Sequence, residues 1–405
     1  MSSFMSESFK FQSGSKTDIG GQRENQDELY EYVNLERNIR VMAVFDGHSK
    51  PTGKMVAIAC RDYMKSMVEN VENHKRMEQD PVGFMTDCFE RGHYHVQDVL
   101  IAEYKRQGYE ICVVSGAILK QCPGSNCWEN VPGGATQSMV LIVKDKMYIA
   151  NVGDSDVLMY SSRPILKKEI IHYEQDATGL PKADEEYEDA DEEEDPALQS
   201  YNLKLTRNHS PENKCEYDRM RKYAHSVTNP NEAKMLFVYD DSAVSQKTNC
   251  KPIFDVNQDG VLTKQPSRVT YYKNIRKECS TYVVSPTGNN SIAFTRSIGD
   301  FGLREYGLTH KPEIQSVDLN HVFGEDAPTV CVIVASDGVW DNWEYDKAGE
   351  FVMYPNCLEQ LTKLPETGAQ NVTNSFMARN DYYAKQHFGG SADNATAVIM
   401  YITKV

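Results

Sequence analysis

The stretch that decides the fold is Val41-Met-Ala-Val-Phe-Asp46-Gly47-His48, a short apolar run that closes on an acidic residue. Apolar runs of this length and composition are typical of buried strands. The same combination of an apolar run with an acid recurs further along the chain. The other segments are Tyr148-Ile-Ala-Asn-Val-Gly-Asp154, Val330-Cys-Val-Ile-Val-Ala-Ser-Asp337-Gly338 and Asp393-Asn-Ala-Thr-Ala-Val-Ile-Met-Tyr-Ile402.

The positions of these acids predict a cluster of carboxylates. Asp46, Asp154 and Asp337 close their strands, whereas Asp393 opens its strand. Neighbouring antiparallel strands place the end of one beside the start of the next, so all four can meet at one rim. Such a cluster repels itself unless cations neutralise it, and hard oxygen ligands suit magnesium or manganese.

An alternative is that these acids only form turns, because Asp-Gly and Asp-Asn pairs commonly end strands. We favour metal ligation because the pattern recurs on several strands of the buried type. A glycine beside a ligand also lets the backbone approach an ion closely, so the Gly47 carbonyl could itself be a ligand.

Composition and charge restrict the class of protein. The chain has 405 residues, 40% of them hydrophobic, and a formal net charge of −16, which is typical of a globular protein that binds neither nucleic acid nor an anionic membrane. No apolar run is long enough to span a bilayer, and no secretory leader is recognisable. The ten cysteines are scattered. We therefore expect a cytoplasmic or nuclear monomer that is not secreted. Cys122 and Cys127 form a close pair, which we interpret as part of a plain loop, with a metal site or a disulfide as the alternatives.

Both ends of the chain contribute to the acidic rim, which favours one domain with insertions. We expect a flexible N-terminal lead-in over residues 1–15 and a single domain over 16–405. The insertions lie near 105–132, 175–200 and 240–290. The hydrophobic patterns predict strands at 28–35, 39–45, 139–143, 147–152, 253–256, 291–294, 330–335 and 396–403, and helices at 55–71 and 81–104.

Two segments invite a functional interpretation. Residues 184–195 hold ten acids in twelve positions, which predicts a disordered surface insertion that could dock a basic partner. The segment Asp255–Thr263 begins like an EF-hand loop, but the twelfth position is Pro266, where a glutamate is needed. We expect a strand and turn there instead of a calcium site.

Three further residues near the first strands are candidates for chemistry. Arg23 carries a planar fork that grips phosphate oxygens, although a lone arginine is more often a surface residue. Asp27 adds another acid to the rim. His48 follows Asp46-Gly47 and could donate a proton to a leaving alkoxide, or could instead only support a ligand or lie on the surface.

An ordered set of motifs resembles the protein phosphatase 2C family, the metal-dependent serine/threonine protein phosphatases. The resemblance runs from about residue 16 to 403. It is carried by Arg23 with Asn25-Gln26-Asp27, Val44-Phe45-Asp46-Gly47-His48, Gly134-Ala-Thr136, Ala150-Asn-Val-Gly-Asp154-Ser155, Leu205-Thr-x-x-His209, Thr295-Arg296-Ser-Ile-Gly299-Asp300, Ala335-Ser-Asp337-Gly338-x-Trp340-Asp341 and Ser391-Ala-Asp393-Asn394-Ala-Thr396.

The resemblance implies an α+β fold, a four-layer α-β-β-α sandwich of two antiparallel sheets packed face to face with helices on both outer faces. It also implies two Mn²⁺ or Mg²⁺ ions bridged by Asp46, with Asp337, Asp393 and the Gly47 carbonyl as further ligands. The roles implied for the remaining residues are an acid that reaches an ion or its waters (Asp27), a phosphate-binding arginine (Arg23), a general acid (His48), and a weaker third metal site (Asp154 and Asp341, shared with Asp337).

The implied activity is hydrolysis of phosphoserine and phosphothreonine in phosphorylated proteins by a metal-bridged hydroxide, without a covalent intermediate. Two ions roughly 3.5–4 Å apart can activate a bridging water and clamp the phosphoryl oxygens. The alternative is an inactive relative that only binds phosphoproteins. One departure concerns Asp156, which stands where many family members have arginine. We hypothesise that this acid strengthens cation binding at the third site or loosens a salt bridge.

Overall fold

A computed structural model describes residues 9–166, 170–175, 181–184, 199–226, 235–257, 261–267, 272–323 and 329–405. Most of the predicted acidic insertion, residues 185–198, lies outside the described residues, as do residues 1–8.

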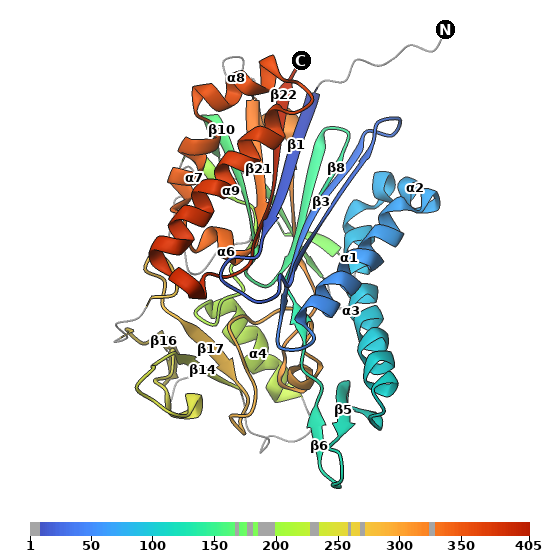
Figure 1. The fold of residues 1–405 in the computed structure, drawn as a ribbon, viewed down its shortest axis with the longest axis vertical. Coiled ribbons are helices and arrows are strands. Elements are labelled where there is room, and N and C mark those ends of the chain that lie inside the picture. Colours follow the sequence, from blue (N-terminus) through green and yellow to red (C-terminus); the bar gives the residue numbers. More distant parts are fainter. Residues whose placement is uncertain are drawn as a thin grey trace.

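Two antiparallel sheets form the centre of the molecule (Figure 1). The first sheet has the strand order β1 (Phe9–Asp18), β22 (Ala395–Lys404), β21 (Thr329–Ala335), β10 (Asp156–Leu166) and β13 (Gln199–Lys204). The second has the order β12 (Pro181–Asp184), β11 (Ile170–Gln175), β20 (Glu313–Asp318), β9 (Lys146–Val152), β8 (Gln137–Val143), β3 (Ile39–His48), β7 (Gly134–Ala135) and β19 (Ile298–Gly299), and β2 (Asp27–Asn34) also pairs with β3.

The strand β3 shows why the two sheets pack face to face. Successive side chains of a strand point to opposite faces. Met42 and Val44 are buried in the core between the sheets, whereas Val41, Ala43 and Phe45 are buried against helices. Both faces of β3 are therefore covered, which accounts for its continuous apolar sequence.

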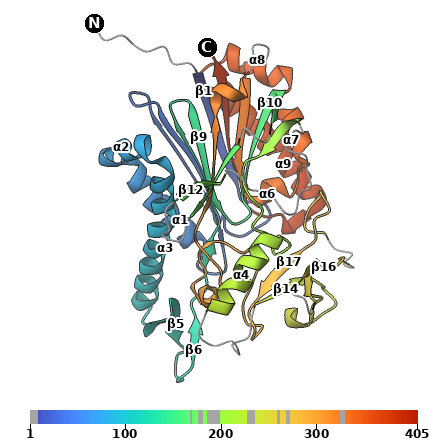
Figure 2. The same ribbon diagram turned by 180° about the vertical axis from the view of Figure 1, so that it is seen from behind.

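Helices cover the outer face of each sheet (Figures 1 and 2). The second sheet is covered by α1 (Gly53–Glu69) and α3 (Pro81–Arg106), with α2 (Val71–Gln79) beside them. The first sheet is covered by α6 (Asp337–Trp340), α7 (Tyr345–Val352), α8 (Pro355–Lys363) and α9 (Gly368–His387). The short α5 (Leu319–Val322) follows β20. The predicted four-layer α-β-β-α sandwich is confirmed. No helix among the described residues is long and apolar enough to cross a membrane.

The prediction of a flexible lead-in is wrong for residues 9–15. They belong to β1, which pairs with β22 from Phe9↔Lys404 to Asp18↔Ala395. The segment reads Phe9-Lys-Phe-Gln-Ser-Gly-Ser and is too polar to be recognised as a strand by itself. It is held as an edge strand because its backbone groups complete the ladder of a buried neighbour.

Several smaller elements extend the domain near the predicted insertions. A small sheet consists of β4 (Ile111–Val114), β5 (Ala117–Gln121) and β6 (Trp128–Asn130). A second one consists of β14 (Leu236–Tyr239), β17 (Thr281–Val284) and β18 (Ser291–Ile292), and it shares an apolar cluster with α4 (Lys214–Ser226). The segment that resembles an EF-hand pairs β15 (Phe254–Val256) with β16 (Leu262–Lys264). Short 3-10 turns lie at Lys247–Asn249, Phe301–Tyr306 and Gly389–Ser391.

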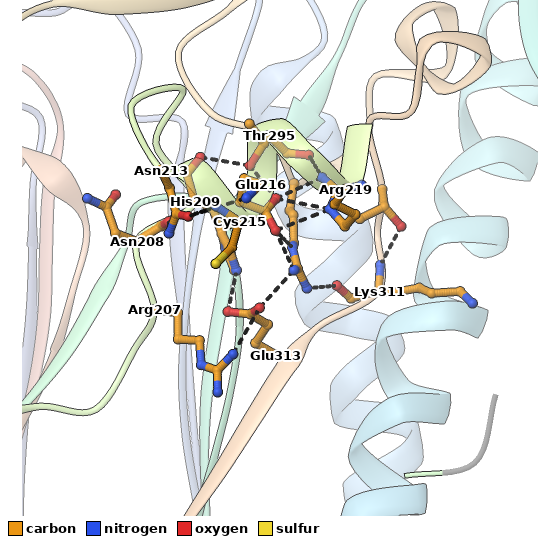
Figure 3. A network of polar contacts seen from close by, with 12 residues as sticks. Arg207, Asn208, His209, Asn213, Cys215, Glu216, Arg219, Thr295, Lys311 and Glu313 are labelled. Carbon is orange, nitrogen blue, oxygen red and sulfur yellow. Dashed lines mark hydrogen bonds and ion pairs between the residues drawn. The ribbon is translucent and has the colours of Figure 1, made fainter. Parts of the chain in front are cut away.

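A buried polar network fixes the start of α4 against the sheets (Figure 3). Glu216 of α4 accepts hydrogen bonds from Arg219 and from Arg296, whose Nε lies 3.1 Å from Oε1 of Glu216. Arg296 also donates to Glu313 of β20 at 2.8 Å. Burial opposes ionisation of both acids, but Arg296 and the other cations hold the pKa of Glu216 well below its usual value and that of Glu313 at about 2.

The network reaches the candidate site through His209. Its Nδ1 accepts a hydrogen bond from the backbone N–H of Gly153 at 3.1 Å, and its Nε2 lies 3.2 Å from Oε2 of Glu313. With Nδ1 as the acceptor, the ring proton lies on Nε2, which donates a hydrogen bond to the Glu313 carboxylate. The turn that carries Asp154 is therefore held in place by side chains from a segment more than fifty residues away.

Candidate metal centre

The predicted acids lie at strand ends of both sheets. Asp27 begins β2 and pairs with Asp46, near the end of β3. Asp337 follows β21 and Asp393 precedes β22, and these two strands pair in the register Ala335↔Ala397. Asp154 follows β9. The rim predicted from the sequence thus has contributions from each sheet.

The backbones at this rim approach one another closely. A Cβ on Gly338 would lie 1.9 Å from the backbone oxygen of Asn394, so only glycine allows α6 to begin beside the start of β22. A Cβ on Gly47 would lie 2.3 Å from the backbone oxygen of Gly53. Packing against the start of α1 therefore requires glycine at position 47, whether or not its carbonyl binds an ion.

The carboxylates of the rim raise one another's pKa. Desolvation raises the pKa of Asp46 well above its usual value, and the charges of Asp27, Asp337, Asp393 and Asp154 raise it further. The pKa of Asp337 is raised in the same way, by desolvation and then by Asp154, Asp341, Asp393 and Asp27. Each acid destabilises the charge on its neighbours, which is the situation that a bound cation relieves.

The cluster is deep at one end and open at the other. Asp27 is buried, Asp46 and Asp337 are partly exposed, and Asp393 is exposed. The Oδ2 atom of Asp27 accepts a hydrogen bond from Ser336 at 2.7 Å, whereas its Oδ1 is buried without a partner among the described residues. Burial raises the pKa of Asp27 to about 6. An unsatisfied buried carboxylate oxygen at the floor of an open acidic rim is consistent with a cation or its water above it.

The donor set fits a hard divalent cation that keeps much of its hydration shell. In the part of the chain that the structure describes, no group of three or more His, Cys, Asp or Glu side chains is arranged to hold one ion. Magnesium usually binds through one or two carboxylates and retains several waters. Asp46 with Asp337 or Asp393, supplemented by waters and by the Gly47 carbonyl, meets that requirement. The assignment of these residues as ligands stays a prediction.

His48 has a partner that the sequence analysis did not assign. Its Nε2 lies 2.8 Å from Oδ2 of Asp300, and the same carboxylate accepts a hydrogen bond from Ser297 at 2.7 Å. Burial opposes the charge on His48, but Asp300 outweighs it and the pKa of the imidazole is raised. Asp300 closes one of the motifs quoted above, which is the only signal that could have marked it.

Arg23 is exposed in the turn between β1 and β2. Asn394, next to Asp393, holds that turn at the rim. Its side chain accepts from the backbone N–H of Gln26 at 2.7 Å and donates to the backbone oxygens of Ile19 at 2.8 Å and Glu24 at 3.1 Å. The arginine is thus carried by a loop tied to the acidic rim, where its guanidinium is free to meet a ligand from solvent. Sequence reasoning did not identify this role of Asn394.

Asp154 and Asp341 lie beside basic side chains that the sequence analysis did not foresee. Together with Asp337 they line a cavity of about 30 Å³ whose wall also includes Lys273 and Arg276. Burial opposes the charge on Lys273, but Asp154, and after it Glu278 and Asp341, raise the pKa of the ammonium above its usual value. This part of the rim therefore already contains positive charge.

Asp156, the residue that stands where many relatives have arginine, is buried, and its carboxylate is hydrogen-bonded. Its carboxylate lies 2.8 Å from Nζ of Lys204 and accepts from Thr206 at 2.7 Å and from the hydroxyl of Tyr345 at 3.0 Å. Its oxygens are therefore occupied by protein donors.

Two cysteines and two histidines that could also be metal ligands have other surroundings. Cys122 and Cys127 are free thiols in the β5–β6 turn, where residues 107–110 and 121–126 line a cavity of about 650 Å³. That cavity shares no lining residue with the acidic rim and contains none of the carboxylates. His93 and His95 point to different surroundings, His93 stacking on His310 and His95 on Tyr63.

Comparisons with known proteins bear on the family and the fold of this chain. The family model described as Protein phosphatase 2C matches residues 11–171 and 272–380, more than half of the chain. The crystal structure of a serine-threonine phosphatase 2C from Toxoplasma gondii is similar over 97% of this chain and 95% of that one, with 15% identity and a TM-score of 0.52. A sex determining protein of C. elegans is similar over 96% of this chain and 64% of its own, with 16% identity and a TM-score of 0.50. No curated protein matches the sequence. At these identities the two structures show a shared fold.

Proposed function

This chain belongs to the protein phosphatase 2C family, and from that premise we propose that it hydrolyses phosphoserine and phosphothreonine in proteins with the help of divalent cations. The observation that carries the proposal is the convergence of Asp27, Asp46, Asp337 and Asp393 from four strand ends, beside the His48–Asp300 pair. Cations held by the acidic rim would neutralise the charge of a phosphomonoester. The proton donor next to the rim would protonate its leaving oxygen.

The proposed cation ligands are Asp46, Asp337 and Asp393 with the Gly47 carbonyl, and Asp27 at the floor would hold an ion or its water. Two Mn²⁺ or Mg²⁺ ions bound there would supply an activated water and neutralise the phosphate charge. The remaining steps belong to the protein. Arg23, on its tethered loop, would grip two phosphate oxygens with its planar fork.

His48 is proposed as the general acid. A serine or threonine alkoxide is a poor leaving group unless it is protonated as the bond to phosphorus breaks. Asp300 accepts a hydrogen bond at Nε2 of His48 and favours the charged imidazolium, so the ring enters the reaction carrying a proton. The proton would be delivered from Nδ1, a buried atom with no hydrogen-bond partner among the described residues.

Phosphate release from a phosphothreonine peptide tests this proposal. We expect turnover with Mn²⁺ or Mg²⁺, none with excess chelator, and recovery when the metal is restored. Asp46→Asn should be inactive under all three conditions. A protein that binds the phosphopeptide but releases no phosphate at any metal concentration would instead be the phosphoprotein-binding relative.

A further inference from the structure

The segment Tyr272–Cys279 forms a tight turn over one end of the acidic rim. Its ends pair at Tyr272 and Cys279. Within the turn, the backbone N–H of Lys273 donates to the backbone oxygen of Glu278 at 2.8 Å. The Nζ atom of Lys273 lies 3.5 Å from Oε2 of the Glu278 side chain. The turn therefore has a defined conformation of its own.

Contacts with the end of α6 fix this turn in place. The backbone N–H of Ile275 donates to the backbone oxygen of Asp341 at 3.2 Å, and the side chain of Asn274 donates to Oδ1 of Asp341 at 3.3 Å. Arg276 donates to the backbone oxygens of Trp340 and Trp343. The guanidinium also lies over the ring of Tyr345, 4.5 Å from its centroid. These contacts fix Lys273 in the wall of the cavity that it shares with Asp154 and Asp341, where its ammonium pairs with Glu278.

The space left between these groups is small. The cavity that Asp154, Asp337 and Asp341 share with Lys273 measures about 30 Å³, and its wall also carries the cations Lys204, Arg207 and Arg276. A hydrated Mg²⁺ or Mn²⁺ ion needs several oxygen ligands around it, most of them waters at such a site. One oxygen of Asp341 is already bound to Asn274. The residues present therefore do not fit a third divalent ion.

We propose that the Lys273 ammonium takes the place of a third metal ion at Asp154 and Asp341, so that this enzyme binds two divalent ions where the resemblance allows three. The inference rests on the proposed function, because it presumes the two-ion centre at Asp46. A tethered ammonium supplies a single positive charge that metal depletion cannot remove. Because the ammonium neutralises Asp154 and Asp341, the ions would be bound by Asp46, Asp337 and Asp393.

The number of Mn²⁺ ions bound to the full chain tests the inference. The protein is stripped with chelator, dialysed and titrated with MnCl₂ while free Mn²⁺ is followed by electron paramagnetic resonance. We expect two ions for the wild type and three for Lys273→Gln, and two again for Lys273→Gln combined with Asp341→Asn. Lys277→Gln, in the same turn but exposed, is the matched control and should bind two.

A wild type that binds three ions, with the third lost in Asp341→Asn, would overturn the inference, as would a Lys273→Gln protein that still binds two. Should Lys273→Gln fail to fold, the wild type and Asp341→Asn decide the question, because equal binding of two ions supports the inference.

Thermal unfolding in chelator separates this inference from the proposed function. Without metal, Lys273→Gln should melt below the wild type, and adding Asp154→Asn should recover most of the difference. A wild type that binds no Mn²⁺ would refute the two-ion centre, while this melting comparison would still decide whether Lys273 neutralises Asp154.

Discussion

The Nε2 atom of His48 lies 2.8 Å from Oδ2 of Asp300, a carboxylate 252 residues further along the chain. The pair forms where β3, β7 and β19 lie side by side, because His48 pairs with Gly134 and Gly134 with Gly299. The orientation of the proposed proton donor is thus set by three strands that have no sequence proximity. This arrangement leaves no room for a side chain at position 134.

Gly134→Ala tests the importance of that geometry. A Cβ at position 134 would lie 2.0 Å from Oδ2 of Asp300 and 2.6 Å from Nε2 of His48, so the pair must open. Because a positioned general acid contributes on the order of 10²–10⁴-fold, we expect kcat to fall by roughly 10²-fold while Mn²⁺ binding is retained. Steady-state kinetics and metal titration measure both quantities.

The control is Gly92→Ala, inside α3, where the new Cβ would make an ordinary 3.5 Å contact with Tyr63. Alanine stabilises a helix interior relative to glycine by about 0.5–1 kcal/mol, so this variant should keep full activity. Unchanged turnover in Gly134→Ala would show that the His48–Asp300 contact is not needed.

Asp46→Asn should have opposite effects on activity and on stability without metal. Turnover should fall at least ~10²-fold, because the ions can no longer be held against the phosphate. In chelator, the variant should melt higher than the wild type, because one of the mutually repelling carboxylates is gone. In a chain of this length a gain of about 1 kcal/mol would raise Tm by roughly 1–2 °C. Asp98→Asn, exposed on α3, should change neither property, and a lower Tm for Asp46→Asn in chelator would contradict the repulsion argument.

Glu313→Gln should destabilise the protein in a pH-dependent manner. Burial opposes ionisation of Glu313, but Arg296 and His209 lower its pKa from 4.5 to about 2. A pKa lowered by folding means that the charged form stabilises the fold above pH 4.5 and that this contribution is lost as the pH falls toward 2. The variant should therefore be less stable by on the order of 3 kcal/mol at pH 7.

Urea unfolding at pH 7, 5, 4 and 3 measures the difference between wild type and Glu313→Gln, which should shrink below pH 4.5. Glu350→Gln removes a pair with Lys347 in which both side chains are more than half exposed. That control should cost less than about 1 kcal/mol at every pH. A difference for Glu313→Gln that does not vary with pH would mean that its charge is not what stabilises the network.

Asp156→Asn should affect stability and not metal binding. Its carboxylate is paired with Lys204 and hydrogen-bonded to Thr206 and Tyr345. Losing a charged partner there should cost roughly 1–3 kcal/mol. Because those oxygens are already occupied, the Mn²⁺ titration curve should superimpose on that of the wild type. A clear shift of the curve would instead support the hypothesis that Asp156 strengthens cation binding.

Much of the fold could be predicted because its signals are local. The apolar run before Asp46 and the hairpin over residues 139–152 show their strand character within a few residues. The helices at 53–69 and 81–106 are recognisable from the helical spacing of their apolar residues. An edge element was expected within the first 22 residues, but its start at Phe9 was missed because its residues are polar and its partner β22 lies at the other end of the chain. The strands β14 and β17 were missed because each has only four residues, too few to show a period.

Which carboxylates stand at strand ends can be recognised locally, because strand patterns and turn chemistry depend on neighbouring residues. Which partners those groups meet depends on how distant parts of the chain fold together. Asp300, which contacts His48, and Lys273, which lines a cavity with Asp154, come from segments remote in the chain. Strand register and the docking of a turn place these partners, and electrostatic contacts across such distances leave no periodic trace in a single sequence.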